Sequence, residues 1–518
     1  MTSLPRIPLE GLTVVASRAD LRASLARPAP AAPTAASAAS AARPARVPHN
    51  KRREARAGTR MDPAVWDRIK EHPCYSEQAH HHFARMHVAV APGCNIQCNY
   101  CNRKHDCANE SRPGVVSRRL TPAEAVDHVR AVAARVPQLS VVGIAGPGDA
   151  LHNAPRTLRT LELVRAALPD LTLCLSTNGL ALPDHVAALK ALDVHHVTIT
   201  INALDPAIGA EIYPWVFHDH RRWRGEEAAR LLRDRQMEGL ARAAEAGLLV
   251  KVNSVLIPGI NDGHMAALNA AVRAQGAFLH NIMPLISDPA HGTRFGLEGR
   301  RGPTPADLHA VRAALGDDAR LMRHCRQCRA DAVGMLGEDT CQEAAPPADD
   351  GARPDPDARA AYRAVVAETR AEHAAAATAA DALVGTVARP AATRRLVAVC
   401  SRGGGRVNLH FGKATEFHVY AVGADGVRFD GIRRADNYCL GGVGDADRLD
   451  AILTTLEGVD AVLCVKVGAG PRRRLEAAGF AVREIPDHAV IETAVADWFA
   501  ATASVGAVPN DAPAAVRA

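Results

Sequence analysis

The sequence predicts an α/β protein with two domains, a partial (βα)6 barrel followed by a second, smaller α/β domain. Between about residues 86 and 315, short β-branched runs alternate six times with amphipathic helical stretches, the pattern of parallel strands joined by helices. A stretch rich in alanine, proline and aspartate follows, and strand and helix patterns resume at about residue 395. Six βα units suit a partial barrel, in which chemistry gathers at the C-terminal ends of the strands.

The six barrel strands are expected at 86–91, 140–145, 171–177, 195–202, 249–257 and 277–285. The first helix is expected to begin after Thr121, because Thr121-Pro-Ala-Glu124 has the spacing of a capping box and places proline at the first helical position. In the smaller domain we expect strands at 396–400, 417–422 and 461–467 and helices at 446–455 and 471–478.

Polar side chains are expected to line the interior of the barrel. Side chains alternate between the two faces of a strand, so Leu171, Leu173 and Leu175 share the face that meets the helices. The residues expected to face the interior are His87, Thr172, Cys174, Ser176, Thr198, Thr200, Asn202, Lys251 and Asn253. An ordinary barrel is filled by branched apolar residues, so this lining sets the chain apart.

Composition divides the chain into five segments. We expect a disordered tail rich in Ala, Pro and Arg at 1–60, the barrel at 61–343, a linker with one alanine-rich helical piece at 344–394, the smaller domain at 395–505 and a disordered tail at 506–518. The formal net charge is +6, and residues 1–60 alone carry a surplus of eight positive charges. The remainder is therefore close to neutral, and we expect no nucleic-acid partner.

The composition also predicts a cytoplasmic protein with no membrane partner. No apolar run approaches the ~20 residues that span a bilayer, and the N-terminus lacks the apolar core of a secretory signal. The 12 cysteines, several at CxxC spacing, fit metal or redox chemistry better than a disulfide framework.

Three cysteines, Cys94, Cys98 and Cys101, stand at CxxxCxxC spacing directly after the first predicted strand. Three thiolates on one loop can hold three irons of a four-iron, four-sulfur cluster and leave the fourth iron free. A closed zinc site would need a fourth protein ligand. This spacing, with Tyr100 before the last cysteine, resembles that of radical S-adenosylmethionine (radical SAM) enzymes, in which the open iron binds SAM.

The resemblance to radical SAM enzymes implies a partial-barrel fold and a set of SAM contacts. The run Ile144-Ala-Gly-Pro-Gly-Asp149 stands where those enzymes carry a glycine-rich turn that binds the methionine amino group. The implied SAM-binding residues are Gly146, Gly148, Asp149, Ser176, Thr200, Asn202, Val252 and Asn253. A Gly-Pro-Gly turn or a threonine at a strand end is common in proteins without any ligand. The inference of SAM binding therefore rests on the occurrence of all these positions around one barrel mouth.

Further cysteines bring the resemblance closer. The stretches from His72-Pro-Cys74 to His87 and from Cys101 to Cys107-Ala-Asn-Glu, with Cys174 and Cys325-Arg-Gln-Cys328, resemble the NifB family of nitrogenase cofactor maturases. That resemblance implies two more four-iron clusters, bound as substrates. By this resemblance, the ligands of one substrate cluster would be Cys74, Cys325 and Cys328. The ligands of the other cluster would be Cys107, Cys174 and His87.

The histidine ligand and the role of Cys341 stay open. Strand parity favours His87 over the run His80-His81-His82, which precedes the strand and is expected in solvent, while His72 remains a rival. The C-terminal run from Cys400 to His418, with His410, and Cys439 further on, resembles the NifX/NafY type of cofactor-binding domain, which implies an RNase H-like fold.

The family resemblance implies a maturase that fuses two four-iron clusters and inserts a carbide from a SAM methyl. Its implied partners are an iron-sulfur cluster donor, an electron donor and nitrogenase cofactor scaffold or carrier proteins. Two alternatives remain. Cys325, Cys328 and Cys341 come near the spacing of the molybdopterin-precursor GTP cyclase, although a terminal Gly-Gly is missing. A cluster carrier without catalysis is the other. The sulfur source, the electron donor and the oligomeric state stay open.

Overall fold

The computed structural model describes residues 61–109, 116, 118–315, 319–325, 327–336, 340–341, 353–387, 394–424, 426–435, 438–440, 443–444 and 446–505. The expected tails at 1–60 and 506–518 lie outside the described residues. From Asp62 onward the chain forms one compact unit. In the part of the chain that is described, no helix is both long and apolar enough to cross a membrane.

The barrel is built on an eight-stranded sheet with the order β11-β10-β1-β3-β4-β5-β8-β9. From β1 to β9 every neighbouring pair is parallel, which confirms the six βα units of the predicted partial barrel. These six strands are β1 (Ala84–His87), β3 (Leu139–Ile144), β4 (Thr172–Thr177), β5 (His196–Thr200), β8 (Leu249–Leu256) and β9 (Leu279–Pro284). At the β1 edge, β10 (Ala332–Gly334) and β11 (Thr340–Cys341) add an antiparallel pair.

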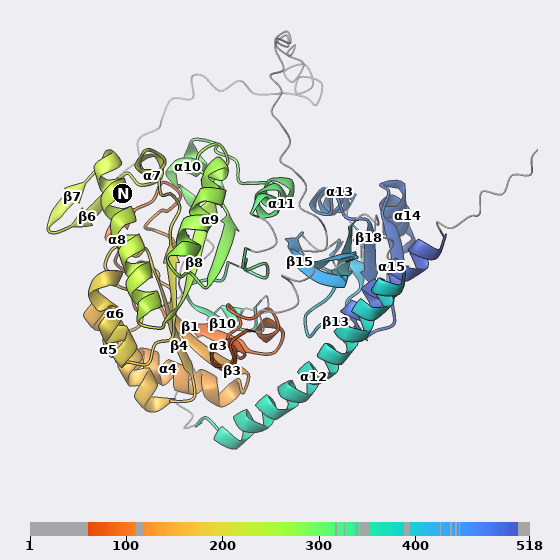
Figure 1. The fold of residues 1–518 in the computed structure, drawn as a ribbon, viewed down its shortest axis with the longest axis horizontal. Coiled ribbons are helices and arrows are strands. Elements are labelled where there is room, and N and C mark those ends of the chain that lie inside the picture. Colours follow the sequence, from red (N-terminus) through yellow and green to blue (C-terminus); the bar gives the residue numbers. More distant parts are fainter. Residues whose placement is uncertain are drawn as a thin grey trace, which may run out of the picture. The chain divides into compact units, whose positions relative to one another are not determined.

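Helices cover the outer face of this curved sheet (Figure 1). The helices that follow the strands are α4 (Pro122–Arg135), α5 (Ala154–Ala167), α6 (Leu182–Ala191), α7 (Pro206–Ile212), α8 (Gly225–Glu245), α9 (Met265–Ala274) and α11 (Pro305–Ala314). Short helical pieces are α3 (Pro63–Ile69), η1 (Ala79–His81), η2 (Asp262–His264), η3 (Pro289–His291) and α10 (Arg294–Leu297). The predicted capping box is present at α4, where Thr121 and Glu124 exchange hydrogen bonds.

The predicted strand parity is confirmed. Leu171, Leu173 and Leu175 are at most 1% exposed and belong to the apolar core between sheet and helices. The opposite face of the same sheet carries buried polar side chains instead, among them Asn253 and Asn281, which are both fully buried. The sheet thus separates an apolar layer under the helices from a polar interior.

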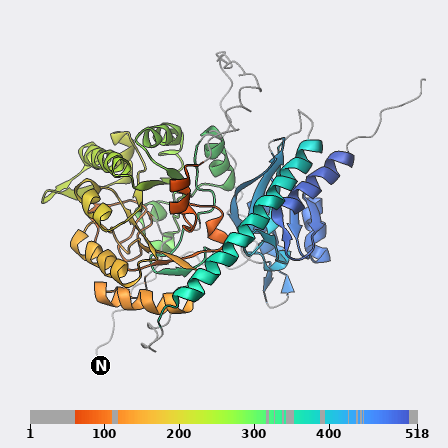
Figure 2. The ribbon, with the colours of Figure 1, turned by 60° about the horizontal axis from the view of Figure 1, so that its bottom comes forward.

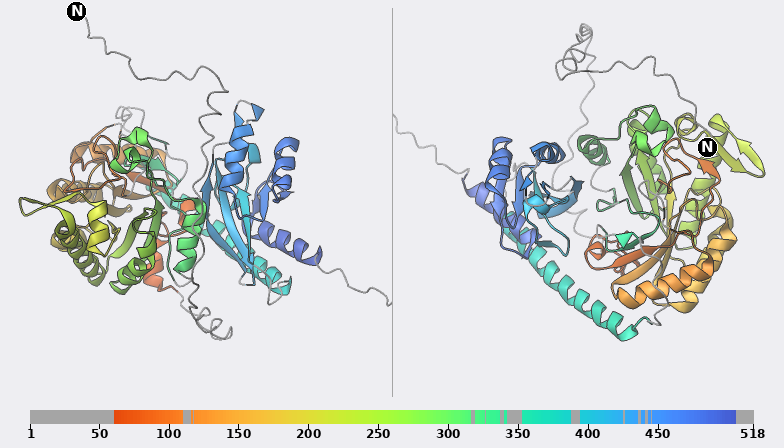
Figure 3. Two further views of the ribbon diagram at one scale, coloured as in Figure 1. Left: turned by 90° about the horizontal axis from the view of Figure 1, so that it is seen from above. Right: turned by 180° about the vertical axis from the view of Figure 1, so that it is seen from behind.

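A β-hairpin outside the barrel sheet was not predicted. Strand β6 (Trp215–His218) pairs with β7 (Arg221–Trp223) and also with β2 (Ile96–Gln97), giving a three-stranded sheet. The hairpin projects from the helix layer beside α8 (Figures 1 and 3). Its partner strand β2 lies between Cys94 and Cys98, so the hairpin is bonded directly to the cysteine motif.

The C-terminal sheet has five strands in the order β15-β14-β12-β18-β19. Its strands are β12 (Arg395–Cys400), β14 (Glu416–Gly423), β15 (Gly426–Arg434), β18 (Ala461–Cys464) and β19 (Ala481–Glu484). Its helices are α13 (Ala446–Thr455), α14 (Ala469–Ala477) and α15 (Ile491–Val505), with the short pieces η4 (Phe411–Lys413), β13 (Arg406–Val407), β16 (Cys439–Leu440), β17 (Val443–Gly444) and β20 (Ala489–Val490). Both faces of the sheet carry apolar cores. The strands expected near 396, 417 and 461 and both expected helices are present, whereas β15, β19 and α15 were not predicted.

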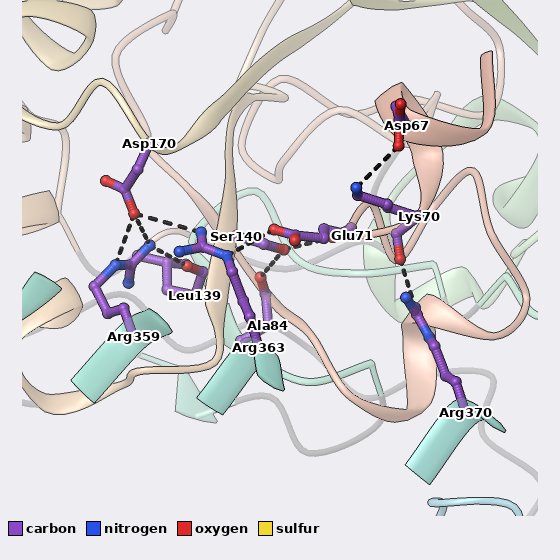
Figure 4. Close-up of polar contacts among 10 residues, drawn as sticks. All are labelled: Asp67, Lys70, Glu71, Ala84, Leu139, Ser140, Asp170, Arg359, Arg363 and Arg370. Atoms are coloured by element: carbon purple, nitrogen blue, oxygen red, sulfur yellow. Dashed lines mark hydrogen bonds and ion pairs between the residues drawn. The ribbon is translucent and has the colours of Figure 1, made fainter. Parts of the chain in front are cut away.

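Much of the stretch expected as a linker, 344–394, is one helix, α12 (Pro356–Val387), of 32 residues (Figure 2). Three of its arginines contact the barrel (Figure 4). Arg359 donates to the Asp170 carboxylate at 2.8 Å and to the Leu139 carbonyl at 2.7 Å. Arg363 donates to Glu71 at 2.9 Å, and Arg370 donates to the Lys70 carbonyl. The alanine-rich helical piece expected in the linker is therefore present, but it takes up much of the stretch and makes specific polar contacts with the barrel.

We predict that Asp170→Ala lowers the free energy of unfolding by about 1–3 kcal/mol. The Arg359 side chain is only 3% exposed, and it would lose its carboxylate partner while staying buried. Urea unfolding would measure the change. Glu162→Ala is the matched control, because its pair with Arg159 is more than half exposed on both sides and should contribute little. Equal losses of unfolding free energy in both variants would contradict the stabilising role given to the contact of Asp170 with Arg359.

Candidate active site

The cysteine loop, residues 91–101, follows β1 and is tied to the turn after β3. The Ala91 carbonyl accepts a hydrogen bond from the Gly148 N–H at 2.6 Å, and the Gly93 carbonyl accepts one from the Asp149 N–H at 2.7 Å. A Cβ at Gly148 would stand 2.0 Å from the Gly93 oxygen. Only glycine therefore allows the turn to approach the cysteine loop this closely.

The second half of the cysteine loop is held from its other side. The Asn99 N–H donates to the Ile212 carbonyl at 2.9 Å, and the Asn99 carbonyl accepts from the Phe295 N–H at 3.0 Å. The Asn95 carbonyl accepts from the Phe217 N–H at 2.7 Å. The turn after β3, α7, the hairpin and α10 thus fix the loop through its backbone, leaving its cysteine side chains to bind a ligand.

The three thiols of the motif fit an iron-sulfur cluster. Cys98 is 4% exposed, while Cys94 and Cys101 are half-buried. Burial raises the pKa of Cys94 to about 11 and raises those of Cys98 and Cys101 as well. Such thiols stay protonated unless a nearby positive charge stabilises the thiolate, which bound iron would do. Among the described residues, no three His, Cys, Asp or Glu side chains are grouped for a single metal ion.

Asp149 positions an amide beside the first cysteine. Its buried carboxylate accepts hydrogen bonds from the Asn178 N–H at 2.5 Å and from the Thr177 hydroxyl at 3.0 Å. Asn178 in turn donates its side-chain amide to Asn95 Oδ1 at 2.6 Å and to Cys94 Sγ at 3.6 Å. Asp149 therefore braces the loop through Asn178, and burial raises its own pKa.

Several residues expected to bind SAM gather at the carboxyl ends of the strands beside the cysteine loop. Thr200 and Asn253 both donate to the Asn109 carbonyl, at 3.3 and 3.0 Å, and Asn202 donates to the Tyr100 hydroxyl at 2.6 Å. Gly146 and Gly148 form the turn already described, and half-buried Ser176 lies on β4. Val252 does not join them, because its side chain belongs to the core under the helices.

His87 and Cys174 lie on the interior face of the barrel with a glycine between them. His87 on β1 is in register with Gly143 on β3, which is in register with Cys174 on β4. A Cβ placed on Gly143 would stand 2.8 Å from Cys174 Sγ and 3.2 Å from the His87 ring. The Nδ1 of His87 lies 3.0 Å from the Arg329 carbonyl, which sets the orientation of the ring. The absence of a Cβ at Gly143 therefore lets these two potential ligands lie close together on the interior face.

Cys74, before the first barrel strand, and Cys325, after the last, lie in one region of the fold. His324 contacts the Pro73 carbonyl at 2.9 Å, so the residues next to the two cysteines touch across the fold. Cys325 Sγ accepts a hydrogen bond from the Asn281 amide at 3.2 Å. Cys328 is 8% exposed and packs in a small apolar cluster with Ala332 and Leu336.

Cys107 lies near the cysteine motif. Burial and the neighbouring thiols Cys101 and Cys94 raise its pKa. The side chain of Cys341 lies outside the described part of the structure.

His72 is packed among rings. Its ring centroid lies 4.4 Å from that of His196 and 4.7 Å from that of Tyr75, and its Nδ1 accepts from the Cys74 N–H at 3.2 Å. Its buried Nε2 has no hydrogen-bond partner among the described residues. Burial and the nearby His196, Lys251 and His87 lower its pKa, so the ring is neutral. His72 thus remains a rival ligand to His87.

The expectation that His80, His81 and His82 lie in solvent was wrong. His80 is 3% exposed and stacks on His324 at 4.8 Å, and the other two are half-buried. The segment before β1 folds back against the barrel, which its polar sequence did not reveal.

Asn281 was missed by the sequence analysis. It lies in register with Asn253 and donates to the Asn253 side-chain oxygen at 3.0 Å as well as to Cys325. The available signal was strand parity, because Asn281 is a polar residue within the sixth predicted strand. Parity alone could not show that its amide meets a cysteine from a loop 44 residues further on.

In the C-terminal sheet, Cys400 is fully buried in an apolar core. His410 is exposed just before η4, whereas His418 is 1% exposed. The side chain of Cys439 lies outside the described part of the structure. Among the described side chains just named, only His410 lies on the surface.

Comparison with known proteins identifies both parts of the chain. Residues 88–271 match the model of the radical SAM superfamily, and residues 393–501 match the model named dinitrogenase iron-molybdenum cofactor. The FeMo cofactor biosynthesis protein NifB of Rhodobacter capsulatus is 57% identical over 436 residues, which cover 84% of this chain and 96% of that protein. The chain belongs to the NifB family. The NifB protein of Rhizobium meliloti (strain 1021) is 53% identical, covering 85% of this chain and 90% of that protein.

Membership of the radical SAM superfamily and of the NifB family agrees with the geometry of the site. The superfamily match begins at Val88, just after β1, and therefore includes the cysteine loop and the strands β3 to β8. As a member of this superfamily the chain is an enzyme that uses a four-iron cluster and SAM, and the three thiols of the loop are suited to hold that cluster. Cys74, Cys325 and Cys328 lie outside the residues that the superfamily model matches.

We predict that Gly143→Ala reduces the iron bound after anaerobic reconstitution by about four per chain, because the new methyl group would occupy the space between His87 and Cys174. Iron analysis and Mössbauer spectroscopy would measure the loss. Gly263→Ala is the control, since a Cβ there has no neighbour within 4 Å in the described structure. Full iron binding by the Gly143 variant would contradict the prediction.

We also predict that Asn178→Ala makes the reduction potential of the SAM cluster more negative. Hydrogen bonds to sulfur set cluster potentials, and this variant removes the amide that donates to Cys94. A redox titration followed by electron paramagnetic resonance would detect the shift. Asn269→Ala removes a comparably buried asparagine, which contacts His280 at 2.8 Å, and should leave the potential unchanged. An unchanged potential in Asn178→Ala would refute a role for this hydrogen bond.

Proposed function

We propose that the chain fuses two four-iron, four-sulfur clusters and inserts a carbide derived from a SAM methyl, giving the eight-iron precursor of the nitrogenase FeMo cofactor. Family membership supports the general role in FeMo cofactor biosynthesis. The arrangement His87, Gly143 and Cys174 is the structural observation that best supports the finer proposal. It provides two metal-binding side chains inside the barrel, in addition to the cysteine loop, and both pack closely over Gly143.

The proposal includes two sets of substrate-binding groups. Cys107, Cys174 and His87 would hold one substrate cluster, and Cys74, Cys325 and Cys328 would hold the other. Asn281 connects the second set to Asn253, a proposed SAM contact, through two hydrogen bonds from one amide. This amide would keep the Cys325 thiolate and the SAM pocket at a constant separation.

Other interior residues would control charge. Lys251 is 2% exposed and close enough to His72 to lower its pKa. A buried ammonium group there would stabilise anionic iron-sulfur substrates inside the barrel.

The four-iron cluster on Cys94, Cys98 and Cys101 would supply reductive cleavage of SAM to methionine and a 5′-deoxyadenosyl radical. Gly146, Gly148, Ser176, Thr200, Asn202 and Asn253 would orient SAM, with Val252 contributing only its backbone.

The same proposal extends to partners and location. Substrate clusters would come from a cluster donor protein, electrons from a donor protein, and the product would pass to a cofactor scaffold or carrier. We assign 61–343 to the catalytic part and 395–505 to a cofactor-binding part, and we place the protein in the cytoplasm. Exposed His410 would be available to hold the product in the second part.

We predict about twelve irons per reconstituted chain and formation of 5′-deoxyadenosine from SAM without GTP. Cys174→Ala and Cys325→Ala should each remove about four irons and abolish precursor formation while SAM is still cleaved, because the cysteine loop is intact. Cys464→Ala, a cysteine buried in the C-terminal sheet, is the control. Iron saturating near eight with a requirement for GTP would favour the cyclase, and iron binding without SAM cleavage would favour a cluster carrier.

A further inference from the structure

A cavity of about 320 Å³ is enclosed by the end of β9, helix α11 and the edge strand β15. Its volume lies in the range of small-molecule sites, about 300–1,000 Å³. All of its walls belong to the compact unit that begins at Asp62. Cys325, a proposed ligand of a substrate cluster, lines the cavity, so a cluster bound to this cysteine would border it.

Arginine side chains dominate the cavity wall. The charged residues that line it are five arginines and one acid, namely Arg312, Arg323, Arg394, Arg433, Arg434 and Asp430. The first two arginines belong to the barrel part of the chain, and the other three to the C-terminal part. A guanidinium group presents several N–H donors in a fixed plane and stays charged when it is buried. The wall therefore has the chemistry of an anion site that both parts of the chain build together.

Acidic groups neutralise only part of this charge. Asp430 is shared between two arginines, because its Oδ1 accepts from Arg394 at 2.9 Å and from Arg323 at 3.4 Å. Glu416 pairs with Arg434 at 3.2 Å. Each of these carboxylates thus already has arginine partners.

Two further acids lie near the arginines without lining the cavity. Glu457 is close enough to Arg433 to oppose the lowering of the Arg433 pKa by burial. Glu77 lies near Arg323, but burial raises the pKa of Glu77 to about 7, so this acid is only partly ionised at neutral pH. Among the described residues, five guanidinium groups therefore meet at most four carboxylates, and Arg312 makes no hydrogen bond or ion pair.

Arg312 reaches from α11 to the backbone of β15. A Cβ placed on Gly431 would stand 3.3 Å from Arg312 Nη1. Burial and the nearby Arg323 lower the pKa of Arg312, whereas Asp430 and Cys325 act in the opposite direction. Arg312 is thus a half-buried, unpaired cation beside a proposed cluster ligand. Burying an unpaired charge costs free energy, and an anionic ligand in the cavity would offset that cost.

We propose that this cavity holds the anionic iron-sulfur product as it leaves Cys325. The inference rests on the proposed function, which places a cluster on that cysteine. Release would break the iron–thiolate bond with both electrons staying on sulfur, so the step needs no oxidant or reductant. Arg312 would stabilise the thiolate, and the arginines would donate hydrogen bonds to the sulfides of the product, as donors do to bound iron-sulfur clusters. The product would then contact both parts of the chain at once.

The first test compares Arg312→Glu, Arg312→Lys and the control Arg130→Glu with the unaltered full chain. Arg130 lies on α4 and is 52% exposed. Product labelled with radioactive iron would be extracted from the unaltered chain, and its Kd for each chain would be measured without other clusters. We expect Arg312→Glu to raise the Kd at least about tenfold, because a positive charge is replaced by a negative one. Arg312→Lys should lose much less affinity, and the control should match the unaltered chain.

The folding of the main variant has its own check. A glutamate at position 312 would face Arg323, so the melting temperature of Arg312→Glu should not fall. If it does fall, Arg312→Lys and Arg312→Gln replace it as the informative pair, because both keep a long polar side chain and differ in charge. Equal product binding by that pair would overturn the proposal.

A second test separates binding by the arginines from an effect on the cysteine. The Kd of the product would be compared for Cys325→Ser and Cys325→Ser/Arg312→Glu. A further loss of at least about tenfold in the double variant is expected if the arginine acts on the product itself. Equal values would overturn the proposal. So would an unchanged product Kd in Arg312→Glu combined with loss of inorganic sulfate binding, which would identify a site for small oxyanions only.

A failure of the proposed function would look different, because the unaltered chain would then yield no eight-iron product to extract. A synthetic four-iron cluster with soluble thiolate ligands, which is also an anion, would replace it as the probe. This probe would be added to reconstituted Cys325→Ser and Cys325→Ser/Arg312→Glu chains, whose remaining cluster sites are already filled. Weaker binding by the double variant would support the cavity as a site for anionic clusters, and equal binding would overturn it.

Discussion

The site depends on the backbone hydrogen bonds that hold the cysteine loop from both sides. On one side the Gly148 and Asp149 N–H groups bind the loop at Ala91 and Gly93, and on the other the hairpin and α10 bind it at Asn95 and Asn99. Main-chain groups are well suited to this task because they leave every cysteine side chain available. They also spare the loop the conformational entropy that a flexible segment would lose on taking up a cluster.

The fold of the barrel and the polar character of its interior could be predicted because both follow from periodicity. A two-residue alternation assigns Leu173 to the helix layer and Cys174 to the interior regardless of tertiary detail. The same rule places the side chain of Val252, which was named among the SAM contacts, in the helix layer, and it would have singled out Asn281. The pairing of His87 with Cys174 needs the register of three strands, which no local pattern specifies.

Other features could not be predicted, because their determinants are tertiary. The hairpin β6–β7 is only four and three residues per strand, too short to be distinguished from a loop, and it is stabilised by pairing with the cysteine loop. The contacts of Asn109 with Thr200 and Asn253 join residues about 90 and 144 positions apart. The alanine-rich composition of the segment around α12 predicted a helical piece, but the contacts of its arginines with the barrel join distant parts of the chain and could not be predicted.

The contacts of α12 restrict how this part of the chain can vary in length. Arg359, Arg363 and Arg370 are spaced by four and then seven residues, close to whole turns of a helix, so they lie along one stripe that meets the barrel. Each inserted or deleted residue turns everything beyond it by about 100° around the helix axis. A single insertion between Arg363 and Arg370 would carry the last arginine off the stripe. Among related chains, insertions and deletions should therefore occur outside α12. Where the length of α12 does differ, the residues along the stripe should differ as well.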